Sequence, residues 1–292
     1  MPIVLVCLKN FQEYILTNIQ QLIRLGHKEI YILTNIELFS YFENYLNDIK
    51  LISVDELVDN YQFLERCNTD MNFRGGFWTF TSMRFFYIYA FMVQYQIENI
   101  IHLENDVLVY DNCEKLITKL DNNFVYIPFD SFNRNIASIM YIPTVCVFKK
   151  ILDIYSPYET DMTNFVKIRK ETGLIKQFPI FCDEYSSDPE IAFVSNGFNN
   201  FEYIFDGAAI GQFIGGIDPR NNPNFYSVGL SPINNDDCKI GFVNETCVIK
   251  YDKYHIFWRD IDGFKKPFIN VGHKEIPIFN LHIHSKKLEK YL

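Results

Sequence analysis

Short apolar runs and stretches with helical spacing alternate along the first part of the chain. The apolar runs predict strands at residues 2–8, 29–34 and 51–54. Between them, apolar residues recur at helical spacing and predict helices at residues 11–25 and 36–46. Strands that alternate with helices pair in parallel through right-handed crossovers. We therefore expect a Rossmann-like half, in which ligands bind beyond the carboxyl ends of the strands.

The apolar stretch at residues 100–110 differs from the others because it contains two carboxylates. Residues 100–103 predict a buried strand, and Glu104 and Asp106 follow at its carboxyl end. Carboxylates are rarely buried unless they are paired or bound to a metal, so these two predict a site for a divalent cation. A hard cation held in this way completes its shell with water and substrate phosphates. The alternative is an ordinary polar loop at the end of a strand.

An apolar strand, then Glu104-Asn105-Asp106, then a further apolar stretch resembles the Asp-x-Asp motif, in its Glu-x-Asp form, of metal-dependent GT-A-fold glycosyltransferases. These enzymes use nucleotide sugars. The preceding segment, residues 77–86, continues as an apolar helix to about Tyr95 and also resembles what precedes the motif in that family. The resemblance implies Mn²⁺ or Mg²⁺ on the diphosphate of a UDP- or GDP-sugar.

The chain has no internal repeat, linker or low-complexity tract, so we expect one domain over residues 1–292. The expected fold is α/β and GT-A-like, with a mixed, mostly parallel sheet flanked by helices. About residues 1–110 would form the nucleotide-binding half, and about residues 111–292 would form the acceptor half.

Three basic or polar residues in the first half are candidates for nucleotide-sugar binding. Lys9 and Asn10 follow the first predicted strand and could contact the base or ribose, although an exposed polar turn explains them equally well. Arg84 lies on a helix that is apolar nearly all round, and a buried Arg needs a carboxylate or phosphate partner. The resemblance implies that Arg84 faces the acidic motif or the nucleotide. The alternative is a structural salt bridge to Glu104 or Asp106.

The second half is less regular. We predict helices at residues 112–120 and 144–155, strands at residues 124–128, 136–143 and 276–284, and a pair of short antiparallel strands at residues 246–251 and 255–260. Asp161 starts another predicted helix and resembles a position in the acceptor site of the family. An Asp at a helix start is also an ordinary cap.

Residues 205–220 are rich in Gly and Ala, which allow a backbone to approach a ligand or a neighbouring helix closely. Asp206 could bind hydroxyls of the donor sugar or accept a proton. The alternative is a tightly packed helix that Asp206 caps. The stretch lacks the spacing of a dinucleotide-binding loop. Arg220 could contact phosphate or the acceptor.

The last predicted strand ends in Leu281-His282-Ile283-His284-Ser285-Lys286, which resembles the closing His-plus-Lys element of GT-A enzymes. Alternation places His282 and His284 on one face, so both are candidate metal ligands. We favour His282 because it lies deeper in the apolar run. The resemblance places Lys286 on the diphosphate. The alternative is a pair of exposed His side chains on an edge strand.

Charge and composition exclude several function classes. A net charge of −9 and a pI of about 5.2 argue against general nucleic-acid binding, which requires a basic surface. The seven cysteines include no Cys-x-x-Cys pair, so we expect no zinc site and a reducing compartment. We find neither a signal peptide nor a transmembrane stretch, and we expect a cytoplasmic protein.

We therefore predict a metal-dependent transfer of a sugar from a UDP- or GDP-sugar to a glycan, protein or small-molecule acceptor. If the reaction inverts the anomeric centre, Asp206 or Asp161 would be the base that deprotonates the acceptor. A sugar nucleotidyltransferase of related fold is one alternative, but it should carry a Gly-rich basic loop after the first strand, and residues 5–11 contain none. A non-catalytic carbohydrate-binding protein is another, but both acidic-motif residues are present.

Overall fold

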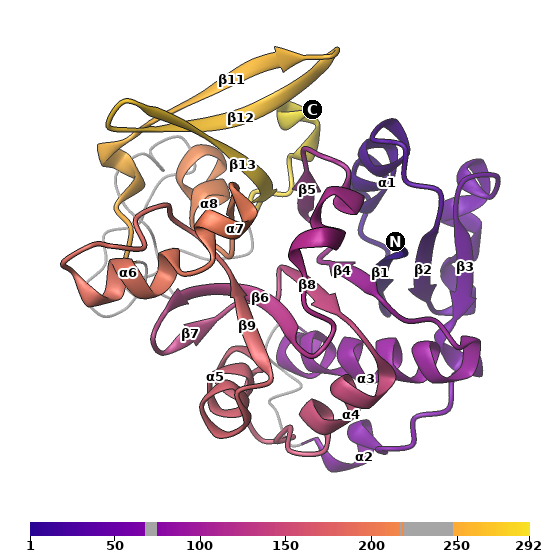
Figure 1. Cartoon of the computed structure of the whole chain (residues 1–292). Helices are drawn as coiled ribbons and strands as arrows, with labels where there is room; N and C mark the ends of the chain where they lie inside the picture. The colour runs from indigo at the N-terminus through magenta and orange to yellow at the C-terminus, as the bar shows by residue number, and fades with distance from the viewer. Residues whose placement is uncertain (68–74, 217, 219–247) are drawn as a thin grey trace.

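The computed structural model describes residues 1–67, 75–216, 218 and 248–292, which form an α/β fold with two sheets (Figure 1). The described strands of the larger sheet are β1 (Ile3–Cys7), β2 (Ile30–Thr34), β3 (Lys50–Ser53), β4 (Ile100–Leu103), β6 (Val125–Ser131), β7 (Arg134–Asn135), β8 (Ile139–Ile142) and β9 (Ile175–Phe178). Their order is β3-β2-β1-β4-β8-β6-β7, and β9 pairs with β6.

The larger sheet is mixed and mostly parallel. Strand β1 pairs in parallel with β2 and β4, β2 pairs in parallel with β3, and β6 pairs in parallel with β9. Strand β8 runs antiparallel to β4 and β6, and β7 runs antiparallel to β6. This sheet, with helices on its faces, confirms the fold class that the sequence predicts.

The described helices are α1 (Tyr14–Arg24), η1 (Ile36–Tyr45), η2 (Val54–Glu56), α2 (Phe63–Arg66), α3 (Phe77–Tyr95), η4 (Cys113–Lys119), α4 (Val145–Leu152), α5 (Asp161–Thr172), α6 (Pro189–Ser195), α7 (Phe198–Phe201), α8 (Ile210–Gly215), η7 (Tyr251–Lys253) and η8 (Leu288–Tyr291), where η marks a 3₁₀ helix. Residues 36–45 therefore form a helix where one is predicted, but of the 3₁₀ type. The structure has no described helix with the length and apolar character needed to cross a membrane.

Alternating side chains of β1 face two different hydrophobic clusters. Ile3 and Leu5 pack in the cluster that contains the buried face of α1, and Val4 and Val6 pack in the cluster that contains α3. Because α3 is apolar nearly all round, it can be covered by the sheet on one side and by α4 and α5 on another. The sheet is thus buried on both faces, as parallel sheets usually are.

Strand order reverses between β1 and β4. From β1 the chain adds β2 and then β3 on one side, and it returns to place β4 on the other side of β1. The parallel register pairs Val4 with His102, so the residues after Cys7 and those after Leu103 emerge at the same edge of the sheet. In open α/β sheets, such a switch point leaves a crevice in which ligands bind.

The smaller sheet brings the end of the chain to this edge. Its described strands are β5 (Val107–Val109), β10 (Ile204–Phe205), β11 (His255–Ile261), β12 (Phe264–Val271) and β13 (Lys274–His282). Their order is β10-β13-β12-β11, and β5 pairs with β13. The antiparallel pairing sets His282 opposite Val107, one residue after Asp106.

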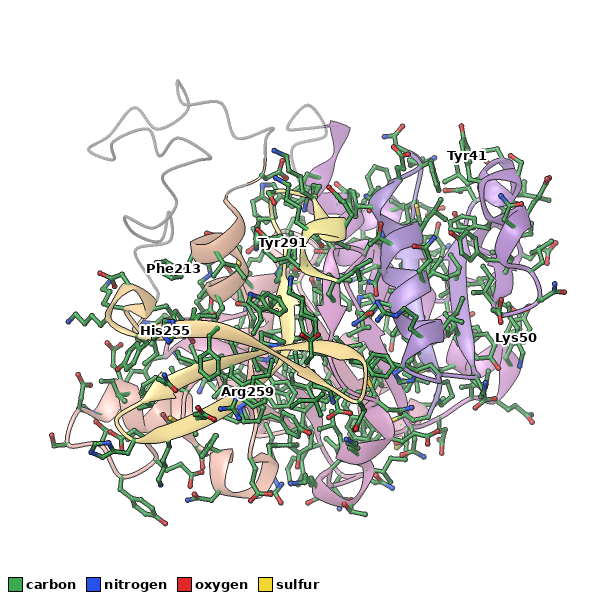
Figure 2. The ribbon with its side chains drawn as sticks, turned by 90° about the horizontal axis from the view of Figure 1, so that it is seen from above. Tyr41, Lys50, Phe213, His255, Arg259 and Tyr291 are labelled. Atoms are coloured by element: carbon green, nitrogen blue, oxygen red, sulfur yellow. The ribbon has the colours of Figure 1, made fainter. Side chains whose placement is uncertain are left out.

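Strand β11 pairs with β12, whereas the sequence predicts a partner at residues 246–251. That prediction is wrong where the structure describes the segment, because residues 251–253 form η7; residues 246 and 247 lie outside the described residues. Asp262 and Gly263 connect β11 to β12, both at positive φ, as a two-residue hairpin turn requires. The resulting ribbon, on which His255 and Arg259 lie (Figure 2), packs through Trp258 against Tyr291.

Candidate functional site

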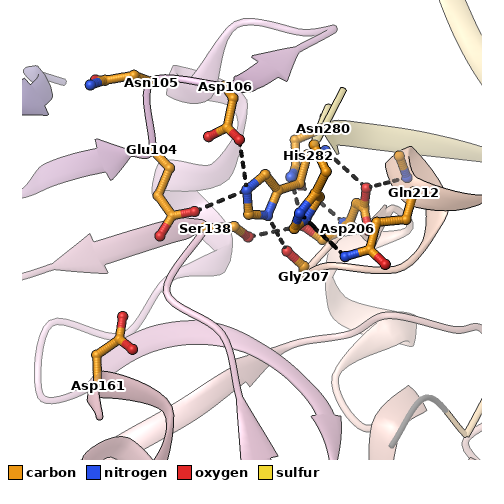
Figure 3. Close-up of polar contacts among 12 residues, drawn as sticks. Glu104, Asn105, Asp106, Ser138, Asp161, Asp206, Gly207, Gln212, Asn280 and His282 are labelled. Atoms are coloured by element: carbon orange, nitrogen blue, oxygen red, sulfur yellow. Dashed lines mark hydrogen bonds and ion pairs between the residues drawn. The ribbon is translucent and has the colours of Figure 1, made fainter. Parts of the chain in front are cut away.

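The acidic motif and the end of β13 meet at the switch-point edge (Figure 3). The His282 Nε2 atom lies 3.0 Å from Glu104 Oε2 and 3.2 Å from Asp106 Oδ2. Among the described residues, these three side chains form a group that could hold a metal ion, with ligand atoms all within 4.8 Å of one another. The fold therefore brings together three candidate ligands that lie far apart along the chain.

A backbone carbonyl fixes the orientation of the His282 ring. Nδ1 of His282 lies 2.7 Å from the carbonyl oxygen of Gly207. Because a carbonyl oxygen only accepts hydrogen bonds, Nδ1 carries a hydrogen and donates it, and Nε2 is the atom that faces the carboxylates. Metal-ligating His residues usually donate their second ring N–H in this way. The donor set therefore fits a divalent cation.

The two carboxylates determine the protonation of His282. Burial alone would lower the pKa of His282, but Asp106 and Glu104 outweigh this effect and hold that pKa well above its usual value. Burial would raise the pKa of Asp106, but Lys286 and His282 hold it well below its usual value. A proton on Nε2 and a cation would therefore compete for the same position.

Two basic side chains flank the three-ligand group. Lys286 Nζ contacts Asp106 Oδ2, and Arg84 Nη1 contacts Glu104 Oε1. Arg84 Nη2 also lies 3.0 Å from Asp161 Oδ2, and Arg84 is only 8% exposed. The ion pair with Glu104 is the structural alternative that the sequence leaves open for Arg84. The carboxylates of Glu104, Asp106 and Asp161 thus face two positively charged side chains, those of Arg84 and Lys286. The formal charge of this set is −1 when His282 is neutral.

His284 lies next to this group. It follows the end of β13, and its ring centroid is 4.0 Å from that of His282. Gln212 Nε2 lies 3.3 Å from both ring nitrogens of His284. The group of possible metal ligands among the described residues contains His282 and does not contain His284.

A cavity of about 550 Å³ opens in front of the group. Its lining includes most of the predicted binding residues, namely Lys9, Asn10, Arg84, Glu104, Asp106, His282, His284 and Lys286. This volume is in the range of small-ligand and cofactor sites. Arg220, predicted to contact phosphate or the acceptor, lies outside the described residues.

The carboxylate of Asp206, a candidate for contact with the sugar or the acceptor, accepts hydrogen bonds from four backbone N–H groups. Its Oδ1 accepts hydrogen bonds from the backbone N–H groups of Ala209 and Ile210, at 2.8 and 2.9 Å. Its Oδ2 accepts from the N–H groups of Gly211 and His282, at 2.7 and 2.8 Å. Asp206 is not among the described residues that line the cavity. It instead holds the start of α8 against His282, which agrees with the packed, capped helix left open by the sequence.

Asp161 also lies behind the cavity lining. It is the first residue of α5, and the cap is Thr160, whose side chain accepts from Thr163 N. One carboxylate oxygen of Asp161 faces Arg84, and the other accepts from Met162 N at 2.9 Å. Burial raises the pKa of Asp161 above its usual value, against the effect of Arg84.

The sequence gives no direct sign that Gly207 contacts His282, because a backbone carbonyl acceptor has no side-chain signature. The only available signal was the density of small residues around it. A Cβ at Gly207 would lie 2.3 Å from Oδ1 of the buried Asp130, so a side chain at this position would clash with Asp130.

No protein-family model matches the chain, and no curated protein sequence matches it. The chain is similar to the solved structure of mouse xyloside xylosyltransferase 1, with 12% identity, a TM-score of 0.43, and coverage of 68% of this chain and 91% of that chain. It is also similar to the bifunctional glycosyltransferase WbbM (13% identity, TM-score 0.41, 69% of this chain and 43% of that chain). A third similar structure is the glycosyltransferase GlyE of Streptococcus pneumoniae (17% identity, TM-score 0.41, 63% of this chain and 46% of that chain). The chain spans less than half of the WbbM and GlyE chains.

Proposed function

We propose that the protein transfers a sugar from a nucleotide-sugar donor to an acceptor, with a divalent cation on the donor's diphosphate. The group of Glu104, Asp106 and His282 carries this proposal, because it opens into a cavity at the switch point of the sheet. The N–H···O bond to Gly207 supports it further, since it leaves Nε2 of His282 facing both carboxylates.

Asp106 and His282 would ligate the cation directly, and Glu104 would complete the ligand set or hold a metal-bound water. Carboxylates suit both Mg²⁺ and Mn²⁺, and the imidazole nitrogen favours Mn²⁺ over Mg²⁺. A cation held by these residues would supply positive charge to neutralise the charge that develops on the diphosphate as the sugar–phosphate bond breaks.

The remaining residues would bind and orient the donor. Lys286 is the basic side chain closest to the ligand Asp106, and we assign it to the diphosphate. Lys9 and Asn10 follow β1 and line the same cavity, and we assign them to the base or ribose of a UDP- or GDP-sugar. The division into a nucleotide-binding half and an acceptor half stays a prediction.

Arg84 would act mainly on other side chains. Its two terminal nitrogens face Glu104 and Asp161, so its charge is already shared between two carboxylates. We propose that Arg84 orients Glu104 toward the cation and that Asp161 fixes Arg84 from behind. Asp206 would orient His282. These roles replace those of acceptor base for Asp161 and Asp206, since neither lines the described part of the cavity.

The experiment is incubation with a panel of UDP-, GDP- and CMP-sugars plus Mn²⁺, with detection of released nucleotide. We expect slow release of UDP or GDP from one donor, abolished by EDTA and by Asp106→Ala. Absence of release from every donor, together with absence of Mn²⁺-dependent nucleotide binding, would contradict the proposal. Release of pyrophosphate from a nucleoside triphosphate and a sugar phosphate would indicate a nucleotidyltransferase instead.

A further inference from the structure

Helix α1 buries two amide side chains on its apolar face. The face contains Ile15, Ile19 and Leu22, and between them lie Asn18, which is 0% exposed, and Gln21, which is 3% exposed. Burying an amide lowers stability unless the group is hydrogen-bonded, so both positions require partners. Neither residue stands out in the sequence as part of a site.

Asn18 contacts the backbone of the acidic motif. Its Nδ2 lies 3.3 Å from the carbonyl oxygen of Asn105 and 3.4 Å from that of Glu104. Both acceptors are carbonyl groups, so the NH₂ group of Asn18 must face them. One side chain therefore bridges two successive peptide groups between the candidate ligands Glu104 and Asp106.

Asn105 holds the same loop from the other direction. Its Nδ2 donates to the carbonyl of Val6 at 2.8 Å and to Gln12 Oε1 at 2.7 Å. The loop is thus tied to the end of β1 through Asn105 and to α1 through Asn18. The carbonyl of Asp106, in turn, accepts from Ile283 N at 2.9 Å, directly after His282.

We propose that Asn18 is a positioning residue for the candidate metal centre. By holding the carbonyl groups of Glu104 and Asn105, it sets the peptide planes from which the carboxylates of Glu104 and Asp106 project. Metal ligands must be held within about 0.5 Å of their working geometry. Loss of a residue that orients a ligand typically weakens metal binding by about 10- to 100-fold. This role rests on the proposed function of the site.

Gln21 provides a matched control on the same helix. Its Nε2 donates to the carbonyl of Val109 at 3.0 Å, in β5 and beyond the motif. Gln21 and Asn18 have the same functional group, similar burial and backbone acceptors. Gln21→Leu therefore removes a comparable interaction without releasing the loop that carries the carboxylates.

The experiment is a Mn²⁺ titration of the full chain, alone and with UDP or GDP, in which electron paramagnetic resonance measures free Mn²⁺. The melting temperature in EDTA records the stability of each variant. We expect Asn18→Leu and Gln21→Leu to lower the melting temperature by similar amounts. Asn18→Leu should weaken Mn²⁺ binding by about tenfold or more, and Gln21→Leu should leave it close to that of the wild type.

Equal Mn²⁺ affinities in the two variants would overturn the positioning role of Asn18. If Asn18→Leu does not fold, Asn18→Ser and Gln21→Ser make the same comparison, because Ser removes the amide without adding apolar bulk. A wild-type protein that binds no Mn²⁺ under either condition would overturn the proposed function and, with it, this role. Wild-type binding with unchanged affinity in the Asn18 variants would overturn this role alone.

Discussion

The ring of His282 donates a hydrogen bond from Nδ1 to the carbonyl of Gly207 at 2.7 Å, and this bond turns Nε2 toward Glu104 and Asp106. Gly207 belongs to the small-residue stretch, and His282 belongs to the last strand of the chain. The contact explains how two segments that lie outside the Rossmann-like half orient a side chain toward the carboxyl end of β4.

Replacement of His282 and of His284 should therefore have unequal effects. His282→Ala removes a candidate ligand and should weaken Mn²⁺ binding in the presence of nucleotide by at least about tenfold. His284→Ala should have a much smaller effect, because His284 lies outside the ligand group among the described residues. Metal titration of both variants measures the difference. Near-wild-type affinity in both would exclude this strand from the metal site.

Gly211 allows α8 to approach the end of β13. A Cβ at this position would lie 2.0 Å from the carbonyl oxygen of His282, a backbone atom that cannot move away alone. Gly211→Ala should reduce the free energy of unfolding by about 1–3 kcal/mol, as overpacking does, and should weaken Mn²⁺ binding by displacing His282.

Gly215→Ala is the control for this variant. Its Cβ would meet the hydroxyl of Tyr291 at 2.7 Å, the far end of a side chain. Chemical denaturation and metal titration should show a loss of metal affinity in Gly211→Ala and not in Gly215→Ala. A Gly211→Ala protein with full stability and affinity would contradict the close packing.

Asp130 should make stability depend on pH. Its side chain is buried, and burial raises its pKa from 3.8 to about 6, although Arg134 opposes the shift. Because the folded state binds the proton more tightly than the unfolded state, this group favours folding fully below about pH 4, and the contribution is lost as pH rises through about 6. At about 1.4 kcal/mol per pKa unit, the loss is on the order of 3 kcal/mol.

Asp130→Asn should remove this dependence, so its gain in stability over the wild type should grow between pH 4 and pH 7. Urea denaturation across this range measures the difference. Asp121→Asn is the control, since hydrogen bonds from Asn123 lower the pKa of the half-exposed Asp121 carboxyl and give the opposite sign. A constant difference between wild type and Asp130→Asn would show that Asp130 does not titrate there.

Lys286 should contribute to nucleotide affinity. Loss of a hydrogen bond to a charged group costs about 1.5–3 kcal/mol, so Lys286→Ala should weaken UDP or GDP binding by roughly 10- to 100-fold. Its requirement for Mn²⁺ should persist. Lys287→Ala, at the exposed neighbouring position, should bind nucleotide normally. Calorimetric titration of both variants makes the comparison, and equal affinities would remove Lys286 from the diphosphate site.

The sequence predicts the regular half of the fold well because burial on both sheet faces leaves clear apolar runs. It predicts a helix at η1 but not its 3₁₀ type, since apolar spacing does not determine the hydrogen-bond pattern. Strand β12 is missed because Lys265, Lys266 and Pro267 interrupt its apolar alternation in a half-exposed ribbon.

The candidate site is predictable in its residue types and only partly in its contacts. Glu104, Asp106 and His282 are identifiable because polar side chains at the ends of apolar strands are unusual. The place of Asp206 is not, because a carboxylate before a helix suits both a cap and a ligand contact. The choice between them depends on the N–H of His282, which a distant strand brings to Asp206. The role of Asn18 is also not predictable from the sequence, since its partners are backbone carbonyls of a distant segment.

The most direct test of the metal-dependent nucleotide site is the melting temperature with UDP or GDP, measured in Mn²⁺ and in EDTA, for the wild type and Asp106→Ala. Ligand that binds only the folded state raises stability by about 2.7 kcal/mol at 100 times its Kd. We predict that nucleotide raises the melting temperature of the wild type in Mn²⁺ but not in EDTA, and that it leaves Asp106→Ala unchanged in both. Stabilisation of Asp106→Ala equal to that of the wild type, or stabilisation of the wild type that persists in EDTA, would contradict the metal site.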